Sequence, residues 1–382
     1  MKRALLLSLV FVASLLSVPA AQAPALDAVL ATLDAELAAD LAKDGVGGAS
    51  IAVITGPGAV WTRHYGFADM AAKRAPTGDS VYRIGSITKQ FTALALLRQV
   101  EAGRMRLSDP LEKYVPEMKG MRRRQDGWSA PTLLQVATMN GGIAREPDLS
   151  CVDHSVGPLS VWQQKVVGCL PQTGYASEPG TQHLYSNIGY AALGLAIERA
   201  GGAPFTTQVI DGIVTPLGMT RTAWEPTADL RRDLAFGYTR QQGKPDRTQP
   251  DREFDGRGYR VPNGNLFSTL TDLTRFVQWE LGQIQAPIIT RARQTDNYGR
   301  IYASNGTLAG GYGVGFQIIR RGELMALGHG GSTAGYRASA LFNPTTGTGV
   351  VVLRNAEGGT FDATPVAVRI LEKVAAARTP AR

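Results

Sequence analysis

Residues 82–93 read Tyr82-Arg83-Ile84-Gly85-Ser86-Ile87-Thr88-Lys89-Gln90-Phe91-Thr92-Ala93. The pattern predicts a helix from about Ser86 to Glu101, ended by Gly103, with Ser86 and Lys89 on one face. Backbone N–H groups in the first turn of a helix are unpaired and carry the positive end of its dipole. A serine placed there can act as a nucleophile, because its own N–H can face a developing oxyanion while the lysine helps to remove the hydroxyl proton. Taken alone, the spacing is more often that of a capping serine and a surface lysine.

Two further short motifs follow along the chain. Tyr185-Ser186-Asn187 comes just before a helical stretch, and His329-Gly330-Gly331-Ser332 lies between two strand-like runs. The two glycines of the second motif would let the backbone of a substrate approach closely. Each motif by itself has an ordinary structural interpretation, a core tyrosine beside a turn asparagine in the first case and a plain turn in the second.

Several other kinds of chemistry are excluded by what the chain lacks. It has only four histidines, His64, His154, His183 and His329, and they form no HExxH pair or clustered metal set. The nearest approach to a nucleophile elbow is 330–334, one residue off the Gly-x-Ser-x-Gly pattern, and no histidine follows it. No phosphate-binding loop or dinucleotide fingerprint is present, so the sequence predicts neither a metal nor a cofactor.

The order of the predicted elements indicates the fold. A helix and a hairpin come first, a mostly helical middle follows, and strands and a helix close the chain. We predict an α/β fold of the α+β type: an antiparallel sheet flanked by helices and built from both chain ends, with an inserted helical lobe. The expected lobes are 24–106 with 259–382, and 107–258. The expected helices are 26–41, 86–101, 191–198 and 363–376; the expected strands are 50–54, 60–65, 313–319, 324–328, 336–342 and 349–353.

Taken together, the three motifs resemble those of the penicillin-recognising serine hydrolases, which include class C β-lactamases, DD-peptidases, D-aminopeptidases and serine esterases. The resemblance extends over nearly the whole mature chain. The segments 107–110, 216–219 and 268–273 look like further features of that family. The family's β-lactamase/transpeptidase-like fold agrees with the arrangement predicted from the order of elements.

The resemblance implies a role for each motif residue. Ser86 is the nucleophile that forms an acyl-enzyme, and Lys89 is its charged proton partner. Tyr185 corresponds to the general base, with a phenol pKa of about 10 pulled down by nearby cations. Asn187 hydrogen-bonds the substrate and the lysine, and the oxyanion hole pairs the backbone N–H groups of Ser86 and Ser332, the latter just past Gly331. No cofactor or metal is implied.

The chain also departs from the family pattern. Where class C β-lactamases carry Lys-Thr-Gly, this chain has His329-Gly330-Gly331. A histidine is mostly neutral at pH 7, so His329 would hold a carboxylate less well and depress the pKa of Tyr185 less. Hydrolysis of a short-chain ester or a D-amino-acid peptide is therefore favoured. A true β-lactamase or DD-carboxypeptidase is the alternative, and a non-hydrolytic penicillin-binding or sensor protein is a third possibility. The segment 139–141 also differs from the usual family residues and is expected to alter packing near the cleft.

Residues 1–23 read as a secretory signal peptide, with Lys2 and Arg3 before an apolar run and cleavage expected after Ala23. The apolar run is shorter than the roughly 20 residues needed to span a bilayer, so we expect a periplasmic or secreted protein without stable membrane insertion.

Two cysteines, Cys151 and Cys169, fit an oxidising compartment. A disulfide between them would stabilise the fold by about 3 kcal/mol, the alternative being two buried thiols. The net charge of +8 is scattered, and the longest basic run, at 122–124, lacks interleaved aromatic residues. We therefore expect a small-molecule or short-peptide substrate and no nucleic acid. The sequence does not indicate an oligomeric state.

Overall fold

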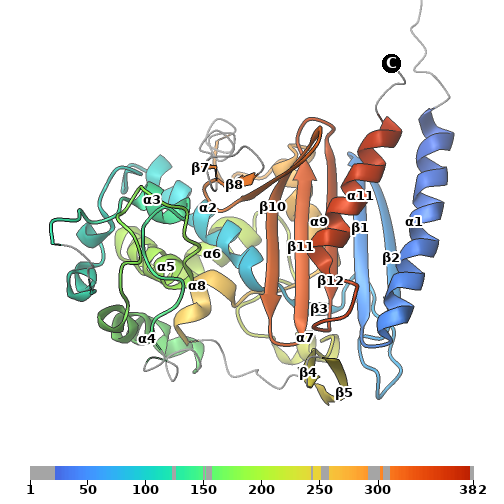
Figure 1. Cartoon of the computed structure of the whole chain (residues 1–382), viewed down its shortest axis with the longest axis horizontal. Helices are drawn as coiled ribbons and strands as arrows, with labels where there is room; N and C mark the ends of the chain where they lie inside the picture. Colours follow the sequence, from blue (N-terminus) through green and yellow to red (C-terminus); the bar gives the residue numbers. More distant parts are fainter. Residues whose placement is uncertain are drawn as a thin grey trace, which may run out of the picture.

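The computed structural model describes residues 22–122, 126–148, 151, 157–241, 244–250, 258–290, 302–303 and 310–378. Within them, eight strands form one antiparallel sheet flanked by helices, and strands from the two ends of the chain lie next to each other (Figure 1). The predicted fold class is confirmed. In spatial order the strands are β2 (Ala59–Gly66), β1 (Gly48–Gly56), β12 (Thr348–Arg354), β11 (Tyr336–Asn343), β10 (Leu324–Thr333), β9 (Gln317–Arg321), β8 (Gly310–Tyr312) and β7 (Tyr302–Ala303).

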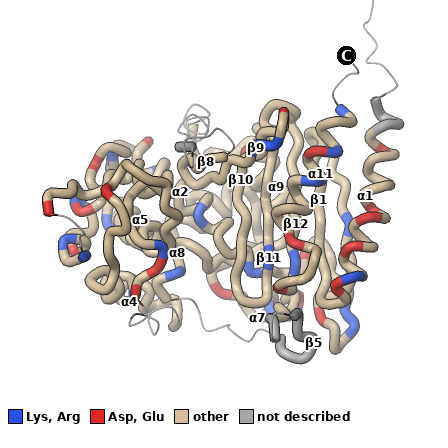
Figure 2. The backbone as a smooth tube through the Cα atoms, viewed as in Figure 1, with Lys and Arg blue, Asp and Glu red and all other residues tan. Residues whose placement is uncertain are grey.

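One face of the sheet is covered by α1 (Gln22–Asp44) and α11 (Ala363–Arg378), which lie side by side (Figure 1). Alternate apolar residues of the strands bury themselves under these helices, as expected for a sheet face packed on a core. Charged residues join the outer surfaces of the two helices, where Figure 2 shows both signs of charge. The ion pairs are Arg369–Asp40 at 2.7 Å and Lys373–Glu36 at 2.6 Å.

Both predicted terminal helices are confirmed. The first begins at Gln22, so it includes the last two residues of the predicted leader, and the remainder of that leader lies outside the described residues. None of the helices in the described ranges is both long and apolar enough to cross a bilayer.

The opposite face packs against α9 (Leu270–Glu280) and, beyond it, α2 (Thr88–Glu101), α5 (Asn187–Gly201) and α8 (Val261–Gly264). Helix α2 is buried on nearly all sides, and Phe91 stacks on Phe276 of α9 with ring centroids 4.6 Å apart. A helix buried all round is held by packing in every direction. The residues at its N-terminus are therefore fixed in position.

The segment 107–258 contains short helices and turns, as expected. It also holds a hairpin that the sequence did not predict, β4 (Tyr238–Gln241) with β5 (Lys244–Pro250). The division into lobes at 107 and 258 stays a prediction. The remaining α-helices of this segment are α3 (Leu133–Ala137), α4 (Trp162–Cys169), α6 (Phe205–Val209) and α7 (Ala228–Arg232).

One strand prediction was wrong, and another strand is longer than predicted. The expected strand 313–319 is interrupted, because Gly315 takes a left-handed conformation (φ 85°) in a turn between β8 and β9. The third motif is not a turn: β10 continues through it, with His329 opposite Ala340 and Ser332 opposite Arg337 of β11. Gly330 and Gly331 have no side chains, so another segment can pack directly against β10 at that point.

Candidate active site

Ser86 lies in a single 3-10 turn, Gly85–Ile87, immediately before α2. Gly85 has a φ of 52°, a conformation that glycine adopts without strain. A Cβ added to Gly331 of β10 would collide with the carbonyl oxygen of Ile84 and lie 3.4 Å from the Ser86 nitrogen, and one added to Gly85 would lie 2.8 Å from the Ser332 nitrogen. The two glycines thus let the backbones of Ser86 and Ser332 approach closely.

Lys89, the second residue of α2, is fully buried. Its Nζ lies 3.2 Å from Ser86 Oγ, 2.8 Å from Asn187 Oδ1 and 2.8 Å from the carbonyl oxygen of Asn263. Burial lowers the pKa of Lys89 well below its ordinary value, and the negative charge of Glu146 opposes that effect. The predicted pairing of Ser86 with Lys89 is present in the structure.

Tyr185 lies just before α5, with its ring against two cations. Lys89 Nζ is 4.8 Å and Arg145 Cζ is 4.9 Å from the ring centroid. Burial nevertheless raises the pKa of the Tyr185 phenol above its ordinary value, although the Ser86 hydroxyl and the charge of Arg145 lower it. The charge of Arg145 acts on the pKa of Tyr185 in the expected direction, but loss of hydration outweighs it, so this pKa is raised overall.

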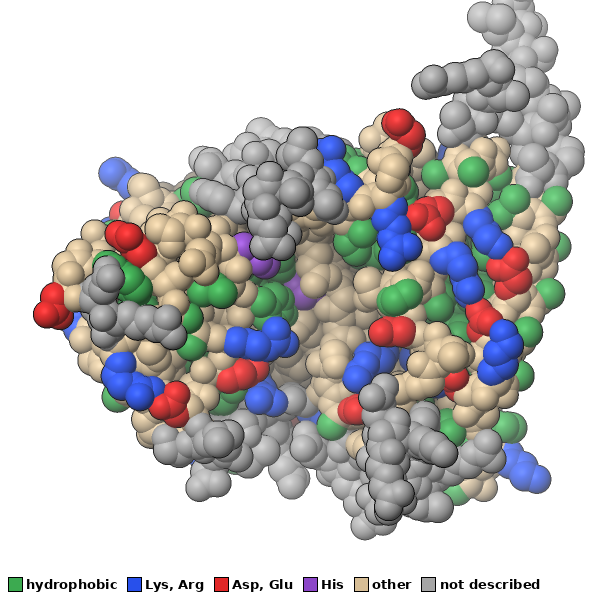
Figure 3. All heavy atoms as spheres, viewed as in Figure 1, with side chains coloured by type: hydrophobic (Ala, Val, Ile, Leu, Met, Phe, Trp, Pro, Cys, Tyr) green, Lys and Arg blue, Asp and Glu red, His purple; other side chains and the backbone are tan. Residues whose placement is uncertain are grey.

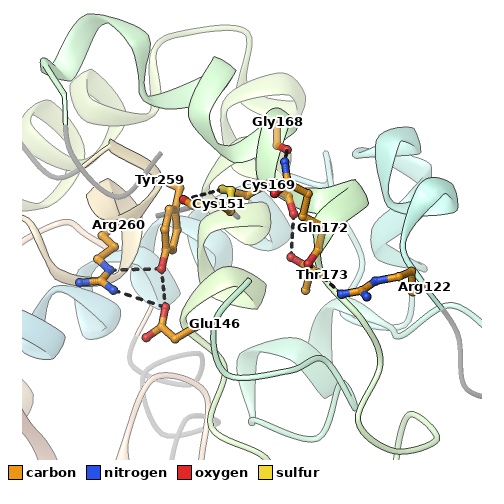
Figure 4. The surroundings of a disulfide bond; sticks show 9 residues. All are labelled: Arg122, Glu146, Cys151, Gly168, Cys169, Gln172, Thr173, Tyr259 and Arg260. Atoms are coloured by element: carbon orange, nitrogen blue, oxygen red, sulfur yellow. Dashed lines mark hydrogen bonds and ion pairs between the residues drawn. A yellow bond between two sulfur atoms is a disulfide. The ribbon is translucent and has the colours of Figure 1, made fainter. Parts of the chain in front are cut away.

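Asn187 is the first residue of α5, whose N-terminus is capped by the Ser186 hydroxyl. Its side chain connects Lys89 to Glu146, since Asn187 Nδ2 donates to Glu146 Oε1 at 2.5 Å. Glu146 also accepts a hydrogen bond from the Tyr259 hydroxyl, and Arg260 Nη2 lies 3.8 Å from it (Figure 4). Neither Glu146 nor Asn263 was identified from the sequence, because both lie outside the three motifs.

His329 is almost completely buried in β10. Its Nδ1 lies 2.5 Å from the Gly330 carbonyl oxygen, which can only accept, so Nδ1 carries the proton. Nε2 then accepts from the Tyr312 hydroxyl at 2.9 Å. Burial and the nearby charge of Lys89 lower the pKa of His329 to about 3. The expected neutral imidazole is confirmed, but both nitrogens are occupied, so His329 has no hydrogen bond left to offer a substrate.

A cavity of about 380 Å³ is lined by residues of all three motifs, among them Ser86, Tyr185 and His329. Figure 3 shows the surface hollowed where a histidine is visible between the helical part and the sheet. A larger groove of about 550 Å³ between α1 and β2 contains none of the motif residues, so we place the candidate site in the smaller cavity. The smaller cavity is lined by Ser86, Arg145, Tyr185, Gln317, His329, Gly330, Gly331, Ser332, Arg337, Asp362 and Thr364.

The atypical segment 139–141 packs directly behind the second motif. Met139 is buried, takes a left-handed conformation (φ 60°) and accepts a hydrogen bond from the Ser186 nitrogen at its Sδ, 3.2 Å away. This agrees with the expected effect on packing near the cleft. The hydrogen bond is made to Ser186, the residue between Tyr185 and Asn187.

A disulfide joins Cys151 and Cys169 in the structure, with Cα atoms 5.7 Å apart and both side chains buried (Figure 4). We predict the same linkage in the purified protein, where it should stabilise the fold by on the order of 3 kcal/mol. Mass spectrometry of a non-reduced digest should show the two peptides linked, and a variant with both cysteines replaced by alanine should unfold at lower denaturant concentration. Complete alkylation of both thiols without reductant would contradict the prediction.

Comparison with known proteins agrees with this geometry. The beta-lactamase family model matches residues 33–375. Protein flp of Staphylococcus aureus (strain NCTC 8325 / PS 47) is 25% identical over 324 residues, which make up 85% of this chain and 62% of that protein. D-alanyl-D-alanine-carboxypeptidase/endopeptidase AmpH of Escherichia coli (strain K12) is 31% identical over 78% of this chain and 73% of its own length.

Among solved structures, the octameric penicillin-binding protein homologue from Pyrococcus abyssi superposes with a TM-score of 0.76 and 25% identity. The match covers 91% of this chain and 77% of that chain. The sheet, the buried helix with its serine and lysine, and these similarities lead to one conclusion. The chain belongs to the beta-lactamase family.

Proposed function

We propose that this protein is an exported serine hydrolase that cleaves an ester or amide through an acyl-enzyme on Ser86. The proposal rests on one observation above all: the Ser86 hydroxyl lies 3.2 Å from the amine of a buried lysine, at the wall of a cavity. A non-hydrolytic binding protein would not require a desolvated amine beside an accessible serine. The predicted leader and the buried Cys151–Cys169 pair support export.

The surroundings of Lys89 favour it, rather than Tyr185, as the base that activates Ser86. A neutral amine has two N–H bonds and one lone pair. The two N–H bonds can serve the oxygens of Asn187 and Asn263 at 2.8 Å, which leaves the lone pair for the Ser86 hydroxyl. The lowered pKa of Lys89 makes this neutral form accessible, whereas the raised pKa of Tyr185 keeps its phenol protonated.

The proposed reaction then proceeds in balanced steps. Lys89 takes the Ser86 proton as Oγ bonds to the substrate carbonyl carbon, and the resulting oxyanion faces the N–H groups of Ser86 and Ser332. Collapse breaks the bond to the leaving alcohol or amine, which takes from Lys89 the proton that came from Ser86. Water attacks the acyl-enzyme by the reverse path, and Ser86 recovers its proton.

The third motif bears on the substrate class. A neutral His329 with both nitrogens occupied supplies no positive charge at the position where a lysine would attract a substrate carboxylate. We therefore favour short-chain esters or D-amino-acid peptides as substrates. The relative AmpH is named for D-alanyl-D-alanine cleavage, which makes DD-carboxypeptidase activity the second candidate.

A turnover panel tests the proposal. The panel compares the turnover of p-nitrophenyl acetate, a D-Ala-D-Ala peptide, a D-amino-acid anilide and a chromogenic cephalosporin. Labelling by a fluorophosphonate is measured alongside. We expect labelling at Ser86 and the highest kcat/KM on the ester or a D-peptide. Absence of both labelling and turnover would identify a binding protein instead.

Replacing His329 with lysine should change this preference. The new ammonium would attract a carboxylate-bearing substrate, and hydrogen bonds to charged groups exceed neutral ones by roughly 1 kcal/mol, or about fivefold. We expect kcat/KM for the cephalosporin to rise relative to that for the neutral ester. His329→Gln, which adds no charge, is the control. A wild-type preference for the cephalosporin of about tenfold or more would contradict the argument.

A further inference from the structure

Glu146 is a carboxylate in contact with the site that has no part in the proposed reaction. It comes from the loop after α3, and its side chain is about one third exposed (33%). Through Asn187 it is one side chain away from Lys89, since Asn187 Nδ2 donates to Glu146 and Asn187 Oδ1 accepts from Lys89. The three residues form a continuous hydrogen-bonded chain that ends at the Ser86 hydroxyl.

The chemistry of these groups determines which way the Asn187 amide points. A carboxylate can only accept hydrogen bonds, so it orients the amide NH₂ toward Glu146 and the amide oxygen toward Lys89. In the flipped orientation the NH₂ group would face the N–H bonds of Lys89 and lose both partners. Without Glu146, Asn187 Nδ2 loses the hydrogen bond that opposes this flip.

The charges around Lys89 show what else Glu146 supplies. The groups that face Lys89 without charge are Ser86 from the 3-10 turn, Tyr190 and Asn187 from α5, Tyr185 before α5, Asn263 from α8 and the neutral His329 from β10. The positively charged groups near Lys89 are Arg145 and Arg260. Among the described residues that act on Lys89, Glu146 is the one whose charge favours the ammonium form. Arg260 and Tyr259 hold Glu146 from its other side.

We propose that Glu146 is a positioning residue for the hydrolysis, which fixes the Asn187 amide with its oxygen toward Lys89 and places a negative charge one side chain away from that lysine. Glu146 touches neither the substrate nor Ser86, and it acts through Asn187 and through its field. This inference rests on the proposed function. It adds a fourth element, from a loop that none of the three motifs includes.

Two variants separate the contact from the charge. Glu146→Gln keeps an oxygen that can accept from Asn187 but removes the charge, and Glu146→Ala removes both. Asp148→Asn is the matched control, because Asp148 lies two residues away and pairs with Arg122 at the surface. The readout is the rate constant for fluorophosphonate labelling of Ser86 between about pH 5 and about pH 10, which requires no knowledge of the natural substrate.

Loss of the charge lowers the pKa of Lys89, so the acid limb of the Glu146→Gln profile should move to lower pH by about half a unit or more. Because a base of lower pKa is weaker, the alkaline plateau should fall about threefold to tenfold. The Glu146→Ala plateau should fall further, and the Asp148→Asn profile should coincide with that of wild type. A variant with merely disturbed packing would lose rate at every pH without a shift of the limb.

The outcomes are distinguishable. A Glu146→Gln profile that coincides with wild type, in a wild type that is labelled, overturns the role of Glu146 and leaves the proposed function intact. A wild type that is not labelled at Ser86 overturns both. If Glu146→Ala does not fold, the Glu146→Gln profile decides by itself.

Discussion

Ser86→Ala should reduce hydrolysis of every substrate to below about 1% of the wild-type rate, because it removes the atom that forms the acyl bond. The fold should be unaffected. Alanine has no difficulty in the conformation of this turn, and Lys89 retains its contacts with Asn187 and Asn263 at 2.8 Å. The measurements are kcat/KM, the mass increment after fluorophosphonate treatment, and the thermal unfolding midpoint.

Ser332→Ala is the matched control for this experiment. Ser332 also lines the cavity and its side chain is exposed, but only its backbone N–H has a part in the proposed reaction. This variant should be labelled and should turn over substrate at close to the wild-type rate. If labelling persisted in Ser86→Ala and disappeared in Ser332→Ala, the nucleophile would be Ser332.

Gly331→Ala should lower kcat/KM by about 100-fold to 1,000-fold, the range observed when one oxyanion donor is lost. The added Cβ would collide with the Ile84 carbonyl oxygen, so β10 would have to move away from the 3-10 turn. That movement separates the Ser86 and Ser332 nitrogens. It should also destabilise the fold by about 1–3 kcal/mol, measured by denaturant unfolding.

Gly330→Ala, one residue earlier in the strand, is the comparison. Its Cβ would meet the Thr364 hydroxyl, 2.5 Å away, a side-chain group that can rotate aside, whereas the Ile84 oxygen belongs to the backbone. The loss of kcat/KM should therefore be at least about tenfold smaller than for Gly331→Ala. Equal losses in the two variants would show that a crowded strand, and not the separation of two N–H groups, accounts for the effect.

The sequence predicted those parts of the molecule that depend on periodicity and on short motifs. The terminal helices, the first hairpin and strands β11 and β12 follow from apolar spacing, and the Ser86–Lys89 contact follows from helical geometry. The continuation of β10 through Gly330 and Gly331 was not predicted, because a pair of glycines between apolar runs is typical of a turn. Here the backbone of Ile84 fills the space that side chains would occupy, and that neighbour lies far away in the sequence.

The electrostatics of the site could not be predicted in the same way. The pKa of Tyr185 depends on how completely its ring is buried, and the Tyr185–Asn187 motif carries no information about burial. Glu146 and Tyr312 are single residues in loop and strand-end segments, and they acquire a role only when folding places them beside Asn187 and His329. Such partners belong to no local pattern, so only the three-dimensional arrangement identifies them.

The pairing of β1 with β12 has a consequence for how the protein is made. Ala49 faces Arg354 across this pair, so this part of the sheet requires one segment that is synthesised early and one that is synthesised late in translation. Until the ribosome has released nearly all of the chain, β1 has only its hairpin partner, and an isolated hairpin is marginally stable in water. Contacts of such long sequence separation form slowly. The pairing of β1 with β12 can therefore form only after the last strand has left the ribosome.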